Sequence, residues 1–466
     1  MKNWQTSDRV IPRHAARIAN RRAGALAAAI LGVCLGAAQA TPYYWDANGT
    51  TAGAGSTPTG TWGTDSFWNT DSAGGSGTFV SSLTSSDDAY FSAGPSATSG
   101  NSAYTVTVSG TQSANGLVFQ SSANAAAPNA ATIITGGTIN LGAGGITASQ
   151  YAYGTTSRGS VSVDSAIVLQ ASSTFTNNNS TNALWVKGAI SDGASSFGII
   201  KSGAGQLNLS GNNSFDGGVT LNAGTLSIRH ANALGTGTLT INGGTLTIAD
   251  TVTVNNNAQI WAGDFTVGTS NGVQRIGAGT VTLGGNRTVT VNSFQNLVVG
   301  GAISDGGSVY GLTKSGAGTI TLSGASTYTG NTIVNAGTMV LSDNARLTFK
   351  IGANGESNQI SGVGTLTLNG DFVFDLSGVA VALGNAWNIV NVGTLAETFG
   401  STFSVVDFFD AGGDLWEKTT GGVTYQFSEA TGNLVITAVP EPSAWALAGL
   451  GLILVTVFRR GRSRSV

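Results

Sequence analysis

The sequence predicts an all-β fold, and within that class a right-handed parallel β-helix, also called a β-solenoid. Glycine accounts for 69 of the 466 residues and charged residues for only 9%, whereas an average globular protein is about 25% charged. Valine, isoleucine and leucine recur at alternating positions in short runs, which is the periodicity of strands with one buried face. Glycine and asparagine separate these runs, and both readily take the positive φ angles of tight corners.

An internal repeat favours the solenoid over an up-and-down β-sandwich, which would share the same local signals. Residues 188–228 and 301–341 align without a gap and are identical at 21 of 41 positions. Their apolar residues alternate, and Leu207 and Leu209 of the first copy match Ile320 and Leu322 of the second. A short unit that recurs with glycine corners is typical of solenoids, so we expect coils of about 20 to 25 residues over residues 121–350.

Residues 1–40 have the three parts of a secretory signal peptide. Arginines between positions 9 and 22 precede the apolar stretch AGALAAAILGVCLGAA, and Ala38 and Ala40 supply small residues for cleavage before Thr41. An uncleaved N-terminal anchor is the alternative. Cleavage would remove Cys34, the single cysteine, so we expect an exported mature chain without a disulfide or a cysteine-based metal site.

Two segments flank the repeats and are expected to close the open ends that a solenoid leaves. Residues 41–120 form an aromatic-rich N-terminal β cap in this interpretation, because Trp45, Trp62, Phe67 and Trp68 crowd one part of the chain. Residues 351–439 lose the rhythm of glycine corners and contain runs such as STFSVVDFFD. We expect a separate C-terminal β unit there.

Residues 440–466 predict a single C-terminal transmembrane helix with a basic end. Pro440, Glu441 and Pro442 precede the apolar run at 443–458, and Arg459 and Arg460 follow it. As a helix the run would span about 24 Å, somewhat less than the hydrocarbon core of about 30 Å. Arginines directly after the helix would stay on the cytoplasmic side, which leaves the body of the chain outside.

The charge of the body argues against nucleic acid as a partner. Residues 41–439 contain 10 Lys and Arg against 21 Asp and Glu, a net charge of −11, while both ends of the chain are basic. Proteins that bind duplex nucleic acid carry basic surfaces.

The pattern GxxKSGAGxxxLSG, present at residues 198–211 and 311–324 within the two copies, resembles the autotransporter-associated β-strand repeat. The ending VPEPSAWALAGLGLILVTVFRR resembles the PEP-CTERM sorting signal. The first resemblance implies a passenger-type β-helix. The second implies that an exosortase-like membrane enzyme recognises Pro440, Glu441 and Pro442 together with the arginines Arg459 and Arg460.

The ionisable residues of the body do not form a recognisable catalytic or metal-binding motif. His230 is the single histidine after residue 40, so neither a Ser/His triad nor a histidine metal site is expected. Asp192 and Asp305 occupy the same position of the repeat, before glycine, which indicates a turn. We therefore predict a protein that is not an enzyme and needs no cofactor.

These observations predict an exported cell-surface or extracellular-matrix protein, adhesive or structural in function, such as a biofilm-matrix component. It would be membrane-anchored through its C-terminal helix, or released to the surface or the exterior after processing. Its expected partners are an exosortase-like processing enzyme, the membrane, and exopolysaccharide or surface glycans. The alternative is a β-helix carbohydrate-active enzyme, a polysaccharide lyase or glycosidase, which would need clustered carboxylates on one face.

Overall fold

The computed structural model describes residues 39–93, 104–120, 131–149, 160–268, 272–393 and 398–440. The chain divides into two units, Met1–Gln39 and Ala40–Val466, and the following concerns the second. The described residues form strands and turns without any α-helix, and none of them belongs to a helix long and apolar enough to cross a membrane. Most of the signal peptide predicted for residues 1–40 and nearly all of the sorting tail predicted for 440–466 lie outside the described ranges.

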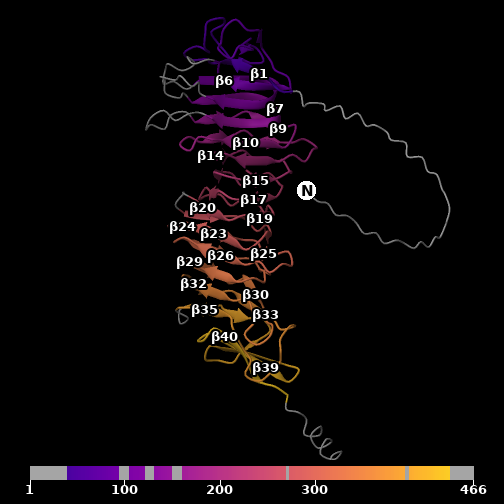
Figure 1. Ribbon diagram of the computed structural model, residues 1–466, viewed down its shortest axis with the longest axis vertical. Coiled ribbons are helices and arrows are strands. Elements are labelled where there is room, and N and C mark those ends of the chain that lie inside the picture. Colours follow the sequence, from indigo (N-terminus) through magenta and orange to yellow (C-terminus); the bar gives the residue numbers. More distant parts are fainter. Residues whose placement is uncertain are drawn as a thin grey trace, which may run out of the picture. The chain divides into compact units, whose positions relative to one another are not determined.

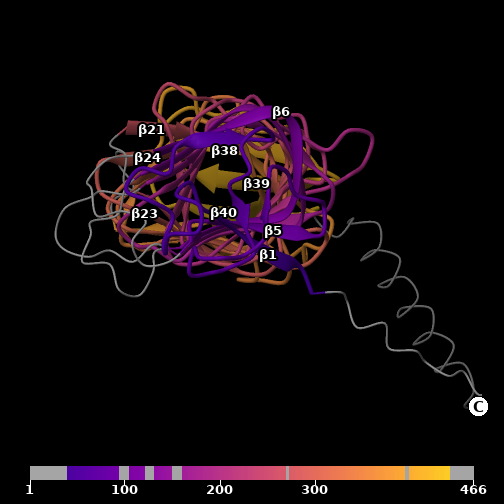
Figure 2. The same cartoon turned by 90° about the horizontal axis from the view of Figure 1, so that it is seen from above.

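Parallel strands stack coil upon coil in three ladders, here called faces A, B and C (Figure 1). Seen along the stack, the strands surround a common interior, which is the arrangement of a β-solenoid (Figure 2). The all-β class and the parallel pairing are thus confirmed, and the right-handed sense stays a prediction. Two long strands, β6 (Tyr104–Gln120) and β7 (Thr132–Ser149), each contribute to all three faces.

The strands of each face follow one another at intervals of one coil. Face A contains β1 (Thr41–Trp45), β5 (Asp87–Phe91), β10 (Ser173–Asn177), β13 (Ile199–Ser202), β15 (Val219–Leu221), β17 (Leu239–Ile241), β19 (Gln259–Trp261), β22 (Val281–Leu283) and β25 (Ile303–Ser304). A parallel bridge at Ala325 continues it to β30 (Arg346–Lys350), β33 (Asp371–Asp375) and β36 (Ser404–Val405).

The other two faces are built in the same way. Face B contains β2 (Gly60–Trp62), β8 (Val161–Val163), β11 (Leu184–Val186), β14 (Gln206–Leu209), β16 (Thr225–Ile228), β18 (Thr245–Ile248), β20 (Phe265–Val267), β23 (Arg287–Val291), β26 (Leu312–Ser315), β28 (Thr332–Val334), β31 (Ile360–Gly362) and β35 (Val390–Val392). Face C contains β9 (Ala166–Leu169), β12 (Ile190–Ser191), β21 (Gly272–Arg275), β24 (Gln295–Val299), β27 (Thr319–Leu322), β29 (Thr338–Leu341) and β32 (Thr365–Leu368).

Antiparallel strands occur at the two ends of this stack. Near its start, β3 (Trp68–Asn69) pairs with β1 and with β4 (Phe79–Val80). Near its end a five-stranded antiparallel sheet is formed by β34 (Ala386–Asn388), β37 (Phe409–Asp410), β38 (Leu415–Thr420), β39 (Val423–Ser428) and β40 (Asn433–Ala438). Pairing of this kind covers strand edges that would otherwise be open to other chains.

Apolar side chains point inward and stack in register. Leu207 of β14 lies beside Leu226 of β16, which lies beside Leu246 of β18, and all three are fully buried. Burying one such side chain stabilises the fold by about 1.5 to 3 kcal/mol. Near the start of the stack the interior is aromatic instead, with Trp68 packed edge-on against Trp45 and Trp62 at ring-centroid distances of 4.9 and 5.0 Å.

The coil length varies, which places the two sequence repeats on different faces. The coil that leads from Gln206 to its partner Thr225 is shorter than the coil that leads from Arg287 to its partner Leu312. On face A, five successive strand pairings lead from β13 to β25. The next strand in the chain, β26, pairs with β23 and therefore belongs to face B. The strand IIKS of the first copy thus lies on face A and its counterpart LTKS lies on face B.

Candidate functional site

A groove of about 440 Å³ opens at the corner where the chain enters face B. We call it the amide groove, because three asparagines from three different coils line it. The lining side chains used below are Asn286, Asn331, Asn358, Thr313, Val309 and Ile333. A volume of this size is within the range of small-molecule sites.

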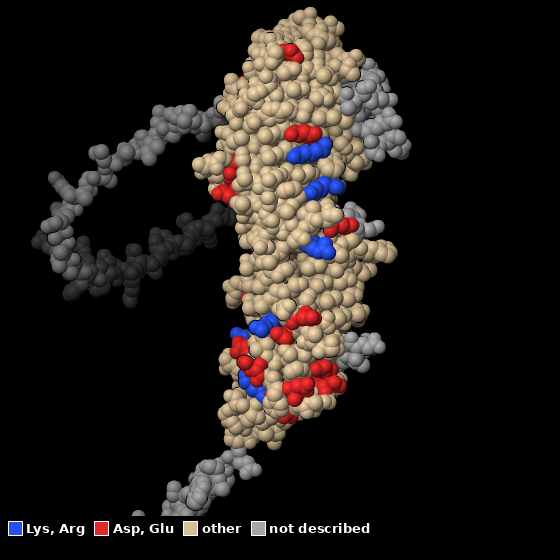
Figure 3. Space-filling view, turned by 180° about the vertical axis from the view of Figure 1, so that it is seen from behind, with Lys and Arg blue, Asp and Glu red and all other residues tan. Residues whose placement is uncertain are grey.

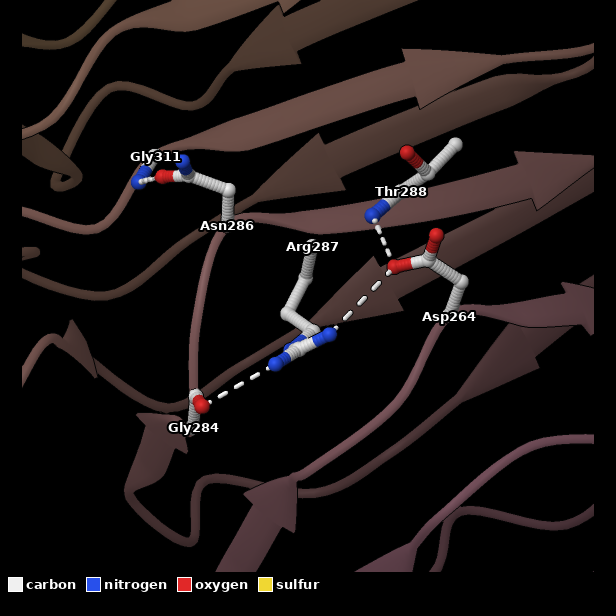
Figure 4. Close-up of polar contacts among 6 residues, drawn as sticks. All are labelled: Asp264, Gly284, Asn286, Arg287, Thr288 and Gly311. Atoms are coloured by element: carbon white, nitrogen blue, oxygen red, sulfur yellow. Dashed lines mark hydrogen bonds and ion pairs between the residues drawn. The ribbon is translucent and has the colours of Figure 1, made fainter. Parts of the chain in front are cut away.

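The register of face B brings the first two asparagines together. Asn286 directly precedes β23 and Asn331 directly precedes β28, and Gly311, directly before β26, lies between them. Asn286 Oδ1 accepts a hydrogen bond from the Gly311 amide at 2.8 Å (Figure 4), and Asn331 Oδ1 accepts one from the Gln359 amide at 3.1 Å. A Cβ at Gly311 would collide with the Asn331 carbonyl, so glycine is required there.

These contacts leave hydrogen-bond donors open toward solvent. Asn286 and Asn331 are exposed, and among the described residues no partner is found for either Nδ2. Asn358 is held in place instead, because its Oδ1 accepts from the Lys350 amide at 2.7 Å and its Nδ2 donates to the Thr348 carbonyl at 2.9 Å. The groove therefore presents two free carboxamide NH₂ groups.

The walls between these donors are uncharged. Val309 is 72% exposed, and Thr313 and Ile333 are adjacent partners on β26 and β28 with half-buried side chains. No lining residue carries an ionisable side chain. Amide and hydroxyl groups beside apolar surface suit a neutral polyhydroxylated ligand better than an ion.

An ion pair follows Asn286 directly in the chain, and its two residues are not part of the groove lining. Arg287 Nη2 donates to the Gly284 carbonyl at 2.9 Å, and Nη1 lies 3.7 Å from Asp264 Oδ1 (Figure 4). The same carboxylate oxygen accepts from the Thr288 amide at 2.8 Å. The Arg287 side chain is 19% exposed, and its Nε is buried without a partner among the described residues. This pair connects two coils of face B.

Two buried lysines are the main polar feature that the sequence analysis did not single out. Lys201 Nζ donates to the carbonyls of Ser202, Gly203 and Ala223 at 2.7, 2.8 and 3.0 Å. Lys314 makes the same three contacts, to Ser315, Gly316 and Ala336, at 2.9, 2.7 and 3.0 Å.

Both lysine side chains lie inside the stack, next to the glycine corners that follow their strands. Both residues are 0% exposed, and no carboxylate of the described ranges forms an ion pair with either. Burial lowers the pKa of each to about 8. At neutral pH each ammonium can therefore use its three N–H donors on three backbone carbonyls. We call these two sites the lysine cages; the KSGAG sequence shared by both copies was the signal that could have revealed them.

The residues predicted for processing lie mostly outside the described ranges. Ala40 and Thr41 are described, and Thr41 begins β1 with an exposed side chain. Pro440 is exposed after β40. Ala38, Glu441, Pro442, Arg459 and Arg460 are outside the described residues.

The other ionisable residues considered in the sequence serve local structure. His230 Nδ1 accepts from the Asn232 amide at 3.1 Å. Asp305 Oδ1 accepts from the Gly307 amide at 3.1 Å, as expected for a turn, and Oδ2 accepts from the amide and hydroxyl of Thr329, one coil on, at 2.8 Å each. Burial alone would raise the pKa of Asp305, but these hydrogen bonds lower it.

Carboxylates that are neighbours in the sequence bind different partners in the structure. Asp87 accepts from the amide and hydroxyl of Thr84, whereas Asp88 accepts from Asn115. In the part of the chain that the structure describes, no group of three or more His, Cys, Asp or Glu residues could hold a metal ion.

Comparisons with known proteins agree with both sequence resemblances. Residues 199–228 and 312–341 match the passenger-associated-transport-repeat, and residues 438–463 match the PEP-CTERM protein-sorting motif. The chain therefore carries two such repeats and this motif, as the sequence analysis predicts. The first repeat begins at β13 and the second at β26, so each match includes one lysine cage.

One curated relative is an autotransporter adhesin. The chain is 29% identical over 205 residues to the adhesin BmaC autotransporter of Brucella suis biovar 1 (strain 1330). The match covers 44% of this chain and 4% of the Brucella protein. No solved structure matches the chain significantly.

Proposed function

We propose that this chain is an exported, non-enzymatic adhesive protein of the cell surface or extracellular matrix, and that its amide groove binds neutral glycans. The groove carries the proposal: free NH₂ groups on Asn286 and Asn331 stand beside the apolar Val309 and Ile333, and no lining residue is charged. A sugar offers hydroxyls to such donors and C–H groups to such walls. Individual contacts of this kind are weak, and adhesion would gain strength from several molecules acting together.

The similarity to an adhesin supports this function. The matched Brucella protein is named an adhesin and an autotransporter, and both repeats here belong to a type associated with passenger transport. A solenoid also suits adhesion on physical grounds, because it displays long faces of exposed side chains on a rigid backbone. Figure 3 shows one side of the molecule, which is uncharged over most of its area, while its charged residues gather mainly toward the lower end. Contacts with the uncharged areas would be mainly hydrogen bonds and apolar packing.

A carbohydrate array tests the groove. Full-length protein should bind one or more neutral oligosaccharides, and the double variant Asn286→Ala/Asn331→Ala should weaken that binding about tenfold, since each lost hydrogen bond contributes about 0.5 to 1.5 kcal/mol. Asn212→Ala is the matched control. Asn212 is also an exposed corner asparagine, it is distant in sequence from the groove residues, and its Oδ1 accepts a hydrogen bond from Asn232 Nδ2. Equal binding by wild type and the double variant would contradict the proposal.

Export and sorting form the second part of the proposal. We infer cleavage after Ala40, so that the mature chain begins at Thr41, and recognition of Pro440, Glu441 and Pro442 by an exosortase-like enzyme. The apolar run at 443–458 would hold the chain in the membrane until then, with Arg459 and Arg460 on the cytoplasmic side. The sorting motif matched at residues 438–463 supports this route.

Mass spectrometry of both ends of the secreted protein tests the processing. The expected fragment begins at Thr41 and ends near Pro440. Removal of residues 440–466 should change how the protein divides between membrane and medium. Identical fractionation of the truncated and full-length proteins would contradict a sorting role for the tail.

The same preparation separates adhesion from catalysis. Incubation with neutral and acidic polysaccharides, with and without Ca²⁺, should release no reducing ends and no unsaturated products. The carboxylates that a lyase or glycosidase would need instead accept hydrogen bonds within turns or between coils, as Asp192 does from the amides of Phe197 and Asp216 at 3.1 Å each. Detection of such products would favour the carbohydrate-active enzyme.

A further inference from the structure

A tryptophan between two basic side chains lies on face B, in coils well before those of the amide groove. Trp185 is the middle residue of β11, and its side chain is half-buried. The Arg229 guanidinium carbon lies 4.8 Å from the centroid of its ring, and Lys187 Nζ lies 6.0 Å from it. Distances of this size bring both cations within reach of the π-system. We call these three residues the basic–aromatic cluster.

Arg229 is fixed at one side and open at the other. It follows β16, two coils beyond β11, and reaches back so that its Nε donates to Asn208 Oδ1 of the intervening strand at 2.9 Å. Gln206 Nε2 donates to the same oxygen at 2.8 Å. The residue is exposed, and no partner of its terminal nitrogens is found within the described ranges. The guanidinium is therefore held against the ring with its outer edge free.

The support of this guanidinium contains an unsatisfied donor. Asn208 is 0% exposed, and its Nδ2 has no hydrogen-bond partner among the described residues. Leaving a buried donor unpaired costs about 1 to 3 kcal/mol, and such groups recur at functional sites.

The charges of the cluster do not cancel. Lys187 lies 3.4 Å from Asp164, and both side chains are partly exposed. For Arg229 no ion pair occurs in the described part of the chain. Its cationic edge therefore stands out on a body whose net charge is −11 between residues 41 and 439.

We propose that Trp185, Lys187 and Arg229 form a second binding site, specific for carboxylated glycans such as polyuronates. The free edge of the Arg229 guanidinium pairs with a sugar carboxylate in two parallel hydrogen bonds, the geometry that a planar guanidinium favours. Lys187 adds charge, and the exposed part of the indole offers a flat apolar surface to the sugar ring. The ligand class differs from the neutral glycans proposed for the amide groove, and the two sites are independent.

A pair of matched ligands tests the charge dependence. Hexagalacturonate and its methyl ester differ in their carboxylates alone, and binding of each to the full chain can be measured by calorimetry at low and high salt. We expect the acid to bind, the ester not to bind, and salt to weaken the binding because charged contacts are screened. Binding of the ester as tightly as the acid, or no binding of the acid at low salt, would overturn the proposal.

Variants of the cluster locate the site. Arg229→Gln should lower the affinity for hexagalacturonate about tenfold or more, and Arg229→Lys should restore part of it, because the charge returns without the planar fork. Arg275→Gln is the control: Arg275 Nη1 donates to the carbonyls of Asp250 and Val273, so its removal should leave binding unchanged. An equal loss in Arg275→Gln would show diffuse attraction and refute a defined site.

Folding and nucleic-acid binding are checked in the same series. The urea midpoint of Arg229→Gln shows whether the loss comes from unfolding, and Trp185→Phe, which retains an aromatic ring, should still lower the affinity severalfold. Duplex DNA of equal charge should bind more weakly than hexagalacturonate, and tighter DNA binding would overturn the assignment to glycans. Neutral-oligosaccharide binding by Arg229→Gln should match wild type, so failure here leaves the amide groove proposal unaffected.

Discussion

The two repeat copies, residues 188–228 and 301–341, share a lysine cage but lie on different faces of the stack. In each copy a fully buried lysine donates to the carbonyl of the last residue of its own strand, to that of the glycine directly after it, and to a third carbonyl in the next coil. Lys201 does so on face A and Lys314 on face B. The repeat therefore specifies a local unit of a strand, the corner after it and the contact with the next coil. This unit can form on face A or on face B.

The copies differ where side chains meet solvent or fill the interior. Asn331 and Val309 line the amide groove, and the positions equivalent to them in the first copy hold Gly218 and Ser196. The interior aromatic also changes, from Phe215 in the first copy to Tyr328 in the second. Shared residues thus fix the backbone, and the residues that differ form the groove for which we propose glycan binding.

Loss of a lysine cage should have the largest effect on stability. Lys201→Met and Lys314→Met each leave three carbonyls without their donor, and we expect the free energy of unfolding to fall by about 2 to 3 kcal/mol in either case. Urea unfolding measures this change. Lys187→Met is the control, because Lys187 makes a partly exposed ion pair, and such pairs contribute about 1 kcal/mol or less. Similar values for Lys187→Met and the cage variants would show that the cages do not stabilise the fold.

Exchange of the interior aromatics should have the next largest effect. Tyr328 OH lies 2.6 Å from Thr332 Oγ1, and the equivalent positions of the first copy hold Phe215 and Val219. Phe215→Tyr would bury a hydroxyl beside valine, so we expect a loss of about 1 to 3 kcal/mol.

Adding Val219→Thr to that variant should recover most of the loss, and urea unfolding of both proteins measures the recovery. If the single and double variants are equally unstable, the Tyr–Thr hydrogen bond does not explain the difference between the copies.

The dependence of stability on pH should distinguish caged lysines from exposed ones. The pKa of Lys201 and of Lys314 is lowered to about 8 by burial, whereas an unfolded lysine has a pKa of about 10.4. Between these values the unfolded chain binds more protons than the folded chain, so the free energy of unfolding rises with pH across that window.

The difference between wild type and the double variant Lys201→Met/Lys314→Met isolates this contribution. Wild type should gain stability relative to the variant from pH 8 to pH 10.5 in urea titrations. A difference that stays constant across this window would show that the caged lysines keep ordinary pKa values.

Substitution in the amide groove should have the smallest effect on the free energy of unfolding. Asn331→Gly gives the second copy the residue that the first copy has, and it removes one hydrogen bond to the Gln359 amide. We expect a loss of about 1 kcal/mol or less and a clear decrease in binding of neutral oligosaccharides. A large loss of stability would mean that Asn331 mainly supports the fold.

Much of the fold could be predicted from the sequence because a solenoid repeats local rules. Alternation correctly indicated inward residues such as Leu207 and Ile320, both fully buried, and the glycine corners indicated parallel coils. The expected coil length held only in part, since the coil from Ile360 to its partner Val390 is longer than the sequence predicts. Longer connections between strands account for this difference.

The sites were harder to predict, because they depend on which residues the coils bring together. Arg229 reaches Trp185 only because two successive coils place their strands in register. The same holds for Asn286 and Asn331, which lie apart in sequence and flank one glycine in the structure. The lysines are part of the KSGAG motif and could be seen in the sequence. Their acceptors are backbone carbonyls, which every residue has, so the sequence does not indicate where those acceptors lie.

Disulfide cross-linking tests most directly whether one repeat occupies two faces. Thr288 and Thr313 are adjacent partners on β23 and β26 of face B, whereas Thr282 lies on β22 of face A. In a Cys34→Ser background, Thr288→Cys/Thr313→Cys should form a disulfide under mild oxidation, because neighbouring strands lie about 4.8 Å apart. Thr282→Cys/Thr313→Cys should not. Cross-linking of the second pair in place of the first would place both copies on face A and contradict the account.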